Sequence, residues 1–282
     1  MHPDEFPLDE ALVRALIVDQ FPDWAELPLR RAGEGTVNVI YRLGSDLSVR
    51  LPRRGGEWAD HEREASILAA VAGAVPFDVP RVVAKGRPGR GYPWGWSVHT
   101  WLDGELPWQA IAPAELADLI GALQRLDATA APEPAGGRGR PLRAREGAVR
   151  DALTRYDPPP EAVDLWEAAR EAPEWEGDRV WIHGDLDARN VLVRHGRLTA
   201  VLDWGGAGAG DPAVDAMAAW KLVARDDRPR FRELLEIDDG TWLRAQGWLV
   251  SQALIALGYY TRETNPPLVR EATRWLVEVI AR

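Results

Sequence analysis

Residues 180–205 constrain the fold of this chain more strongly than any other part of its sequence. Short apolar runs alternate there with polar residues and with a turn at residues 195–196. Such runs are typical of buried strands that are joined by functional loops. Asp185, Asn190 and Asp203 lie at or near the ends of the expected strands, so we expect them around one cleft. Carboxylate and amide oxygens are the ligands that Mg²⁺ prefers in proteins.

The spacing of these polar residues matches the requirements of phosphoryl transfer. Asp185-Leu-x-x-x-Asn190 has the arrangement of a kinase catalytic loop, and residues 203–205 stand in the place of its Asp-Phe-Gly motif, with tryptophan for phenylalanine. In-line transfer needs one carboxylate to orient the hydroxyl and accept its proton, and it needs oxygen ligands for the Mg²⁺ ions. Asp185 is therefore the candidate base, and Asn190 and Asp203 are the candidate metal ligands.

The motifs together resemble those of the aminoglycoside phosphotransferase family of small-molecule kinases, also called choline/aminoglycoside kinase-like. H-G-D-x-x-x-x-N lies at residues 183–190, (I/L)-D-(W/F/Y) at residues 202–204 and G-D-P-x-x-D at residues 210–215. A lone His-Gly-Asp is a common loop tripeptide, so the order and context of all three motifs carry the resemblance. The resemblance implies a two-lobed, protein-kinase-like α+β fold. A small N-terminal antiparallel sheet lobe with a helix would precede a larger, mainly helical C-terminal lobe.

The pattern before residue 102 predicts that small sheet. Apolar runs between turn residues predict strands, and apolar residues at helical spacing predict helices. The expected strands lie within residues 29–43 (two strands around a turn at 33–35), 47–52, 79–83 and 95–101, and the expected helices at residues 8–21 and 57–71. Because the sheet pattern ends at Trp101, we expect a nucleotide-binding lobe at residues 1–102 and a catalytic and substrate-binding lobe at residues 103–282.

The resemblance also implies a set of nucleotide-binding residues in the first lobe. Gly35 and Asn38 belong to a G-x-x-N-x-x-Y stretch similar to that of the family, although a glycine turn between strands is also typical of an ordinary hairpin. By position, Thr100 and Leu102 would contact the adenine edge at the hinge. His99 would lie behind the base; a histidine on an apolar strand is more often a core residue, so we assign it no catalytic role.

The cation that holds the nucleotide phosphates departs from the usual kinase pattern. Kinases place a lysine on the third strand, but Lys85 and Lys221 are the only lysines here, and Arg50 is in register instead. Arginine can bind phosphate oxygens through two nitrogens, and Arg50 opens an Arg-Leu-Pro-Arg-Arg run similar to that of macrolide kinases. Glu64 or Glu62 would pair with it, and we favour Glu64. The alternative is an ordinary surface arginine on a strand.

The second half of the chain predicts helices around the catalytic stretch. Helical spacing is expected at residues 113–127, 161–171, 213–223, 229–235, 242–260 and 267–280, and an arginine-rich loop leading into a helix is expected at 130–150. Glu236, Asp238 and Asp239 are candidates for binding amino groups, whereas the tryptophans are candidates for an apolar pocket. An acidic site would favour an aminoglycoside or another polyamine-like alcohol, and an aromatic one a macrolide-like alcohol.

Composition limits the remaining choices. The net charge of −10 argues against a nucleic-acid partner, and the absence of cysteine excludes disulfides and thiolate chemistry. The first residues lack a signal-peptide pattern and no apolar stretch reaches membrane-spanning length, so we expect a cytoplasmic protein without a membrane partner. We also expect a monomer.

The sequence therefore predicts a phosphotransferase that moves the γ-phosphoryl group of ATP or GTP, with Mg²⁺, to a hydroxyl of a small molecule. An antibiotic, either an aminoglycoside or a macrolide, is the first acceptor class, which would make the protein a resistance enzyme. A metabolic sugar or amino alcohol is the alternative acceptor. A catalytically silent nucleotide-binding protein and a metal-dependent hydrolase built on His183, Asp185 and Asp203 are the alternative functions.

Overall fold

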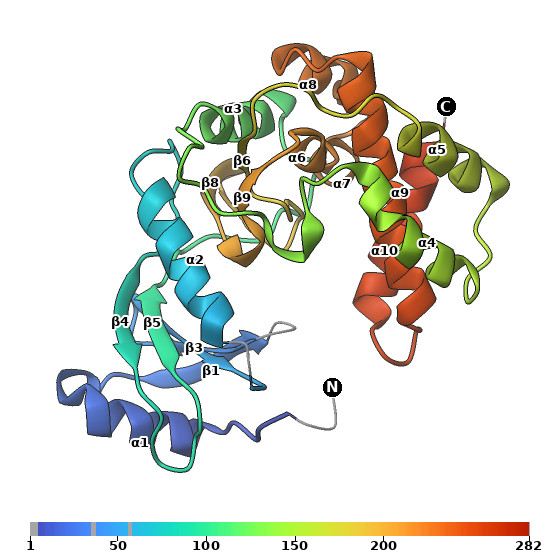
Figure 1. Cartoon of the computed structure of the whole chain (residues 1–282). Helices are drawn as coiled ribbons and strands as arrows, with labels where there is room; N and C mark the ends of the chain where they lie inside the picture. Colours follow the sequence, from blue (N-terminus) through green and yellow to red (C-terminus); the bar gives the residue numbers. More distant parts are fainter. Residues whose placement is uncertain (1–4, 35–37, 56–57, 282) are drawn as a thin grey trace. The chain divides into compact units, whose positions relative to one another are not determined.

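The structure, a computed structural model, describes residues 5–34, 38–55 and 58–281 (Figure 1). The chain folds into two compact units. Unit 1 comprises Met1–Ala74, Asp78–Gly104 and Ala200–Gly205, and unit 2 comprises Val75–Phe77, Glu105–Thr199 and Gly206–Arg282. Each unit contains part of the catalytic stretch that the sequence singles out.

Unit 1 contains a five-stranded antiparallel sheet. Its strands are β1 (Leu29–Glu34), β2 (Asn38–Leu43), β3 (Leu47–Pro52), β4 (Val82–Gly86) and β5 (Trp96–Thr100), in the order β1-β2-β3-β5-β4. The central strand β3 pairs with β2 and β5, and Arg50 stands opposite Ile40 on one side and Ser97 on the other. The predicted sheet is therefore confirmed, and Arg50 lies at its centre.

The two faces of this sheet differ in polarity. Helix α1 (Glu10–Gln20) begins at Asp9, whose carboxylate accepts a hydrogen bond from Leu12 N at 2.8 Å, and the helix packs on apolar residues that include Val49 and Leu51. Successive residues of a strand point to opposite faces, so Ser48 and Arg50 lie on the other face. Helix α2 (Trp58–Val71) contacts that polar face through a hydrogen bond to Arg50.

Unit 2 is mainly helical and is built around the long helix α9 (Figure 1). Helices α4, α5, α6 and α10 pack on α9, and α3 packs on α8 and β6. The helices are α3 (Pro113–Gln124), α4 (Glu146–Leu153), α5 (Pro160–Arg170), α6 (Ala213–Ala216), α7 (Ala218–Leu222), α8 (Arg228–Leu234), α9 (Asp239–Tyr259) and α10 (Pro266–Ile280). Along the whole chain, short 3₁₀ turns lie at Pro22–Trp24, Ala135–Gly137, Leu142–Arg145, Trp204–Gly206 and Arg225–Asp227. The predicted helical content of this half is confirmed.

Two short strand pairs carry the catalytic stretch. Strand β6 (Val180–Ile182) pairs with β9 (Gly208–Gly210), and β7 (Val191–Arg194) pairs with β8 (Arg197–Val201). The turn between β7 and β8 has positive φ at His195 (52°) and Gly196 (74°), as a tight hairpin requires. Sequence analysis missed β9, because its Gly-Ala-Gly sequence has low strand propensity. A side chain at Gly208 would come within 2.4 Å of the Pro132 carbonyl oxygen, so close backbone packing explains this glycine.

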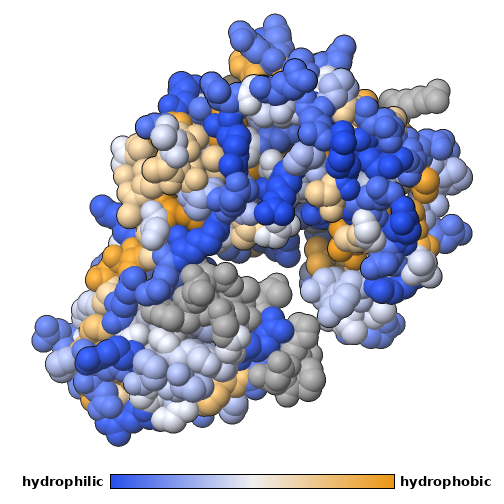
Figure 2. Space-filling view, in the orientation of Figure 1, coloured by the Kyte–Doolittle hydropathy of each residue, from blue (hydrophilic) through white to orange (hydrophobic). Residues whose placement is uncertain are grey.

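Hydrophilic residues cover most of the face seen in Figure 2. Large exposed apolar side chains are few among the described residues, and Trp108 is the most exposed of them at 87%. No helix in the described ranges has both the length and the hydropathy that crossing a bilayer requires.

Candidate active site

In unit 1, β3 and α2 bring a buried ion pair together. Arg50 Nη1 donates a hydrogen bond to Glu64 Oε1 at 2.8 Å. The same Glu64 oxygen accepts a hydrogen bond from Trp204 N at 3.2 Å. Glu62 lies on the exposed side of α2, 3.8 Å from Lys85 Nζ. The structure therefore places Glu64, and not Glu62, beside Arg50.

The turn at residues 203–205 is held against α2. Arg63 donates a hydrogen bond to the Gly205 carbonyl oxygen, in addition to the bond between Trp204 and Glu64. Asp203 has a φ of 59°, a left-handed conformation that is uncommon for residues other than glycine. Such backbone positions persist where the surrounding contacts enforce them. We call Arg50, Glu64 and Asp203 the Arg50 centre.

The charges of the Arg50 centre compensate one another. Burial opposes the charge on Arg50, but the carboxylates of Glu64 and Asp203 outweigh it and raise the pKa of Arg50. Burial likewise opposes the charge on Glu64, but Arg50 outweighs it and lowers the pKa of Glu64. Both partners are thus ionised at neutral pH, which is the state that phosphate binding by Arg50 requires.

Two neutral histidines flank this centre in a chain of hydrogen bonds. His61 Nε2 lies 2.6 Å from Asn38 Oδ1 and His61 Nδ1 lies 3.2 Å from Ser97 Oγ, while His99 Nε2 lies 2.8 Å from the same hydroxyl. Burial and the neighbouring Arg50 lower the pKa of His61 to about 4 and the pKa of His99 to about 3. The amide oxygen of Asn38 is therefore engaged by His61, and its role toward nucleotide stays a prediction.

The structure gives the positions of the other predicted nucleotide-binding residues, but it does not test whether they bind nucleotide. Gly35 lies outside the described residues. Thr100 ends β5, and its hydroxyl accepts a hydrogen bond from Arg81 N at 3.0 Å. Leu102 follows in the segment after β5 and is partly exposed. The hinge contacts of Thr100 and Leu102 with adenine stay predictions.

In unit 2, a buried carboxylate holds the start of the catalytic loop. Asp215 on α6 accepts hydrogen bonds from His183 N at 2.7 Å and Gly184 N at 2.8 Å. Burial raises the pKa of Asp215, although these hydrogen bonds oppose the shift. Gly184 has a φ of 84°, and a side chain there would lie 2.9 Å from Arg138 Cδ. The last aspartate of the G-D-P-x-x-D motif therefore acts on the backbone that precedes Asp185.

The end of the same loop is fixed by Asn190. Its Nδ2 donates to the Asp185 carbonyl oxygen at 2.8 Å, and its backbone N donates to the Asp187 carbonyl oxygen at 3.0 Å. Asp187 is buried and pairs with Arg189 at 2.5 Å. Burial opposes its charge, but Arg189 and Lys221 outweigh burial and lower the pKa of Asp187. The loop thus presents the Asp185 carboxylate from a rigid backbone.

The Asp185 carboxylate itself is held loosely. Gln252 Nε2 on α9 donates to Asp185 Oδ1 at 3.4 Å, and Arg138 Nη2 lies 3.9 Å from Asp185 Oδ2. Lys221 Nζ on α7 donates to Gln252 Oε1 at 2.8 Å. We call Asp185, Asn190, Arg138, Gln252 and Lys221 the Asp185 centre. Sequence analysis missed the last three as site residues, and only the arginine-rich composition of residues 130–150 pointed toward one of them.

The acidic residues proposed for amine binding lie elsewhere in unit 2. Asp238 caps α9 and accepts a hydrogen bond from Thr241 N at 2.8 Å, whereas Asp239 pairs with Arg232. Glu236 is exposed in the turn before α9. At about 1.5 Å per helical residue, Asp238 is about 20 Å along α9 from Gln252. These carboxylates therefore cap and brace the start of α9, far from Asp185.

This architecture is a two-lobed, kinase-like α+β fold of the phosphotransferase class. Solved structures with this fold include a GDP complex of aminoglycoside 2'-phosphotransferase-IIIa, with a TM-score of 0.72, 19% identity and coverage of 97% of this chain and 99% of that chain. Macrolide 2'-phosphotransferase MphH from Brachybacterium faecium has a TM-score of 0.66 and 20% identity, and the match covers 95% of this chain and 98% of that chain. At these identities the likeness shows the fold.

The chain belongs to the Phosphotransferase enzyme family, whose model matches residues 28–249. The match spans both units and includes every motif that carried the resemblance. A curated relative, the uncharacterized protein YcbJ of Bacillus subtilis (strain 168), is 25% identical over 215 residues, which cover 70% of each chain. The predicted family and fold class are thereby confirmed.

Proposed function

We propose that the protein is a small-molecule kinase that transfers the γ-phosphoryl group of ATP or GTP to a hydroxyl group. The observation that carries this proposal is the geometry of the two centres in a member of a phosphotransferase family. One centre offers a buried, charge-compensated arginine beside Asp203, and the other offers Asp185 on a loop fixed at both ends.

The residues divide the work of transfer. Arg50, oriented by Glu64, binds phosphate oxygens of the nucleotide, and Asp185 accepts the proton of the attacking hydroxyl. Asp185 suits this task because its contacts at 3.4 Å and 3.9 Å leave room for a hydroxyl to hydrogen-bond to it. Asp215 keeps the loop backbone in place during the reaction.

The donor set fits a magnesium ion. Asn190 is anchored through its amide nitrogen, which leaves its amide oxygen for a hard cation, and Asp203 supplies a carboxylate. Bound there with the nucleotide, Mg²⁺ would neutralise charge on the phosphates. No group of three His, Asp or Glu residues within the described ranges has a metal-binding arrangement of its own. We therefore propose a metal that binds with the nucleotide.

The positions of the acidic residues bear on the choice between the acceptor classes. The carboxylates that would have favoured a polyamine-like antibiotic are about 20 Å along α9 from Gln252. The known structures with the same fold include kinases named for aminoglycosides and for macrolides, so an antibiotic acceptor stays open. A sugar or another metabolic alcohol is the alternative acceptor.

Nucleoside diphosphate release tests the proposal. Purified protein is incubated with Mg²⁺ and ATP or GTP against aminoglycosides, macrolides, sugars and amino alcohols, with Asp185→Asn as the control. We expect acceptor-dependent release that the variant loses. Nucleotide binding without release for any acceptor, including metabolite extracts, would instead identify a silent nucleotide-binding protein.

A further inference from the structure

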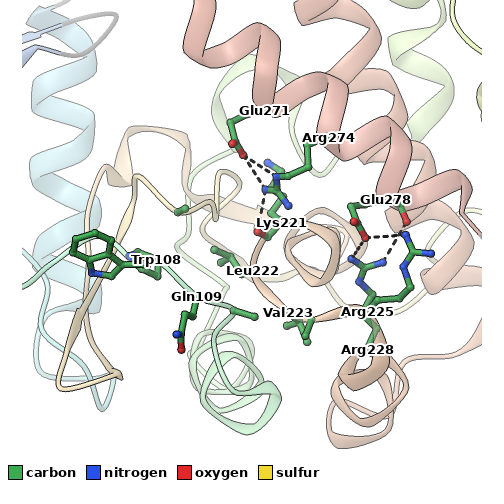
Figure 3. A pocket seen from close by; sticks show the side chains of 14 residues that line it. Trp108, Gln109, Lys221, Leu222, Val223, Arg225, Arg228, Glu271, Arg274 and Glu278 are labelled. Atoms are coloured by element: carbon green, nitrogen blue, oxygen red, sulfur yellow. Dashed lines mark hydrogen bonds and ion pairs between the residues drawn. The ribbon is translucent and has the colours of Figure 1, made fainter.

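A pocket in unit 2 lies directly beside the Asp185 centre. It has a volume of about 430 Å³ and is lined by residues 107–110, by residues 221–225 and Arg228, and by one face of α10 (Figure 3). Ala188 of the catalytic loop and Lys221 also line it. Lys221 donates a hydrogen bond to Gln252, which donates one to Asp185, so these two side chains connect the pocket to the base.

The lining of this pocket has a positive charge balance. Four cations face it, Lys221, Arg225, Arg228 and Arg274, against two carboxylates, Glu271 and Glu278. Both carboxylates are already used: Glu271 accepts from Arg274 at 2.8 Å, and Glu278 pairs with Arg228 at 2.7 Å and Arg225 at 3.3 Å (Figure 3). Neither glutamate is therefore placed to bind an amino group of a ligand.

Lys221 differs from the three arginines of the pocket. The residue is only 5% exposed, its Nζ lies 4.5 Å from the centre of the Trp275 ring, and its ammonium donates a hydrogen bond to the neutral Gln252. Among the residues that the structure describes, no carboxylate forms a direct ion pair with it; Asp185 and Asp187 act on it from a longer distance, but burial outweighs them and lowers the pKa of Lys221. A buried ammonium that lacks such a partner gains much from an anion, because little water competes for it.

Arginines from the segment before α4 also lie near Asp185. Arg138 lies 3.9 Å from the base, and Arg145 lies near Arg138 without a carboxylate contact in the described part of the chain. Arg145 Nε donates to Ser251 Oγ at 2.7 Å, and its guanidinium stacks 4.9 Å from the Trp248 ring centre. Burial, together with Arg138, lowers the pKa of Arg145 to about 10, so Arg145 is charged at neutral pH. Arg138 and Arg145 therefore add positive charge near Asp185.

We propose that the acceptor of this kinase is an alcohol that carries a carboxylate or phosphate group, and that Lys221 binds this anionic group in the pocket beside Asp185. The inference rests on the proposed phosphotransfer function. The acceptor oxygen bonds to the γ-phosphorus, the bond from that phosphorus to the bridging oxygen breaks, and the nucleoside diphosphate leaves with the electron pair. The hydroxyl proton goes to Asp185. A polycationic acceptor meets repulsion at the same place.

A binding experiment tests the anion site without turnover. Inorganic phosphate and sulfate are titrated into the full-length protein while tryptophan fluorescence is followed, since Trp275 lies against Lys221. We expect saturable binding that weakens at least tenfold in Lys221→Met, whereas Lys85→Met, the matched variant at the exposed lysine of β4, leaves it unchanged. Equal affinity in wild type and Lys221→Met, or no saturable binding, overturns the proposal.

A second variant protects this test against misfolding. Lys221→Gln removes the charge but retains a group that can hydrogen-bond to Gln252, and thermal melting reports whether each variant is folded. If Lys221→Met does not fold, Lys221→Gln takes its place with the same expected loss. An anion affinity that Lys221→Gln keeps overturns the proposal as well.

Turnover of matched acceptors then identifies the anion. Glucose, gluconate, glucose 6-phosphate and glucosamine share a carbon skeleton and differ in charge. We expect kcat/KM to favour one of the two anions over glucose by at least tenfold, and we expect Lys221→Met to remove this preference. The anion with the higher kcat/KM shows whether the site prefers a carboxylate or a phosphate. A preference for glucosamine or an aminoglycoside that Asp185→Asn abolishes overturns the anion site and leaves the kinase proposal intact. If no acceptor of this set reacts, the binding experiment decides the anion site.

Discussion

The Arg50 centre and the Asp185 centre hold their central charges in opposite ways. Arg50 has a direct carboxylate partner at 2.8 Å and two neutral histidines around it. Asp185 has cations near it, yet its closest side-chain contact is a neutral amide at 3.4 Å. A group that only binds can be locked in a buried pair. A group that accepts a proton must keep a carboxylate oxygen available, and the difference in contact distance agrees with the different tasks that we propose for Arg50 and Asp185.

Removing the base tests the Asp185 side of this comparison and has the largest expected effect. Asp185→Asn keeps the shape of the side chain but cannot take the hydroxyl proton, so we expect kcat to fall by about 10³-fold. Nucleotide binding, measured by calorimetry, should change little because Arg50 and Glu64 are intact. Substantial turnover in this variant would remove Asp185 from the role of base.

Removing the cation tests the Arg50 side. Arg50→Ala leaves Glu64 buried without its partner, and we expect a loss of about 3–5 kcal/mol in the free energy of unfolding. Arg50→Lys is the matched variant, since it keeps the charge but not the forked geometry. We expect it to remain nearer wild type in chemical denaturation and to raise the nucleotide KM by about tenfold. Unchanged stability in Arg50→Ala would show that the pair is not structurally important.

Acid titration tests the two neutral histidines. The folded pKa values of about 4 for His61 and about 3 for His99 lie below the ordinary value of 6.5. The unfolded chain therefore binds more protons below that value, and stability is highest above it and falls as the pH drops toward the folded pKa values. Between pH 7 and pH 5 we expect each histidine to cost about 2 kcal/mol. Thermal melting of His61→Asn should show a smaller loss over this range; the same loss as wild type would contradict the assignment.

The Gln252 contact has the smallest expected effect. Gln252→Met removes a long hydrogen bond to Asp185, and we expect a fall of about threefold in kcat with little change in nucleotide KM. Gln252→Glu is the sharper variant, since it places a carboxylate between Lys221 and Asp185 and should lower kcat further. Steady-state kinetics of the pair checks this order. Equal activity in both variants would show that Gln252 does not position the base.

Local patterns were sufficient to predict most of the secondary structure. The alternation around Arg50 predicted a strand, and the structure places this strand at the centre of the sheet. The helix expected at residues 8–21 is present as α1, and Asp9 caps it. The preference for Glu64 over Glu62 came from the resemblance, because both are ordinary helix glutamates in sequence; the contact with Arg50 appears only when α2 packs on the sheet. Neighbouring residues of a helix point in different directions, so the helix sequence alone does not specify which side chain contacts which partner.

The sequence by itself determined the family of this protein and was sufficient to propose its chemistry. The aspartates and the asparagine of the catalytic motifs lie close together in the sequence. Their spacing can therefore be recognised without knowing how the chain packs. Only the tertiary structure decided what surrounds the base. Arg138, Lys221 and Gln252 come from three distant segments, and only the packing of these segments brings their side chains near Asp185. Asp238 begins α9 and lies about 20 Å along it from Gln252, and this separation also depends on how the elements pack.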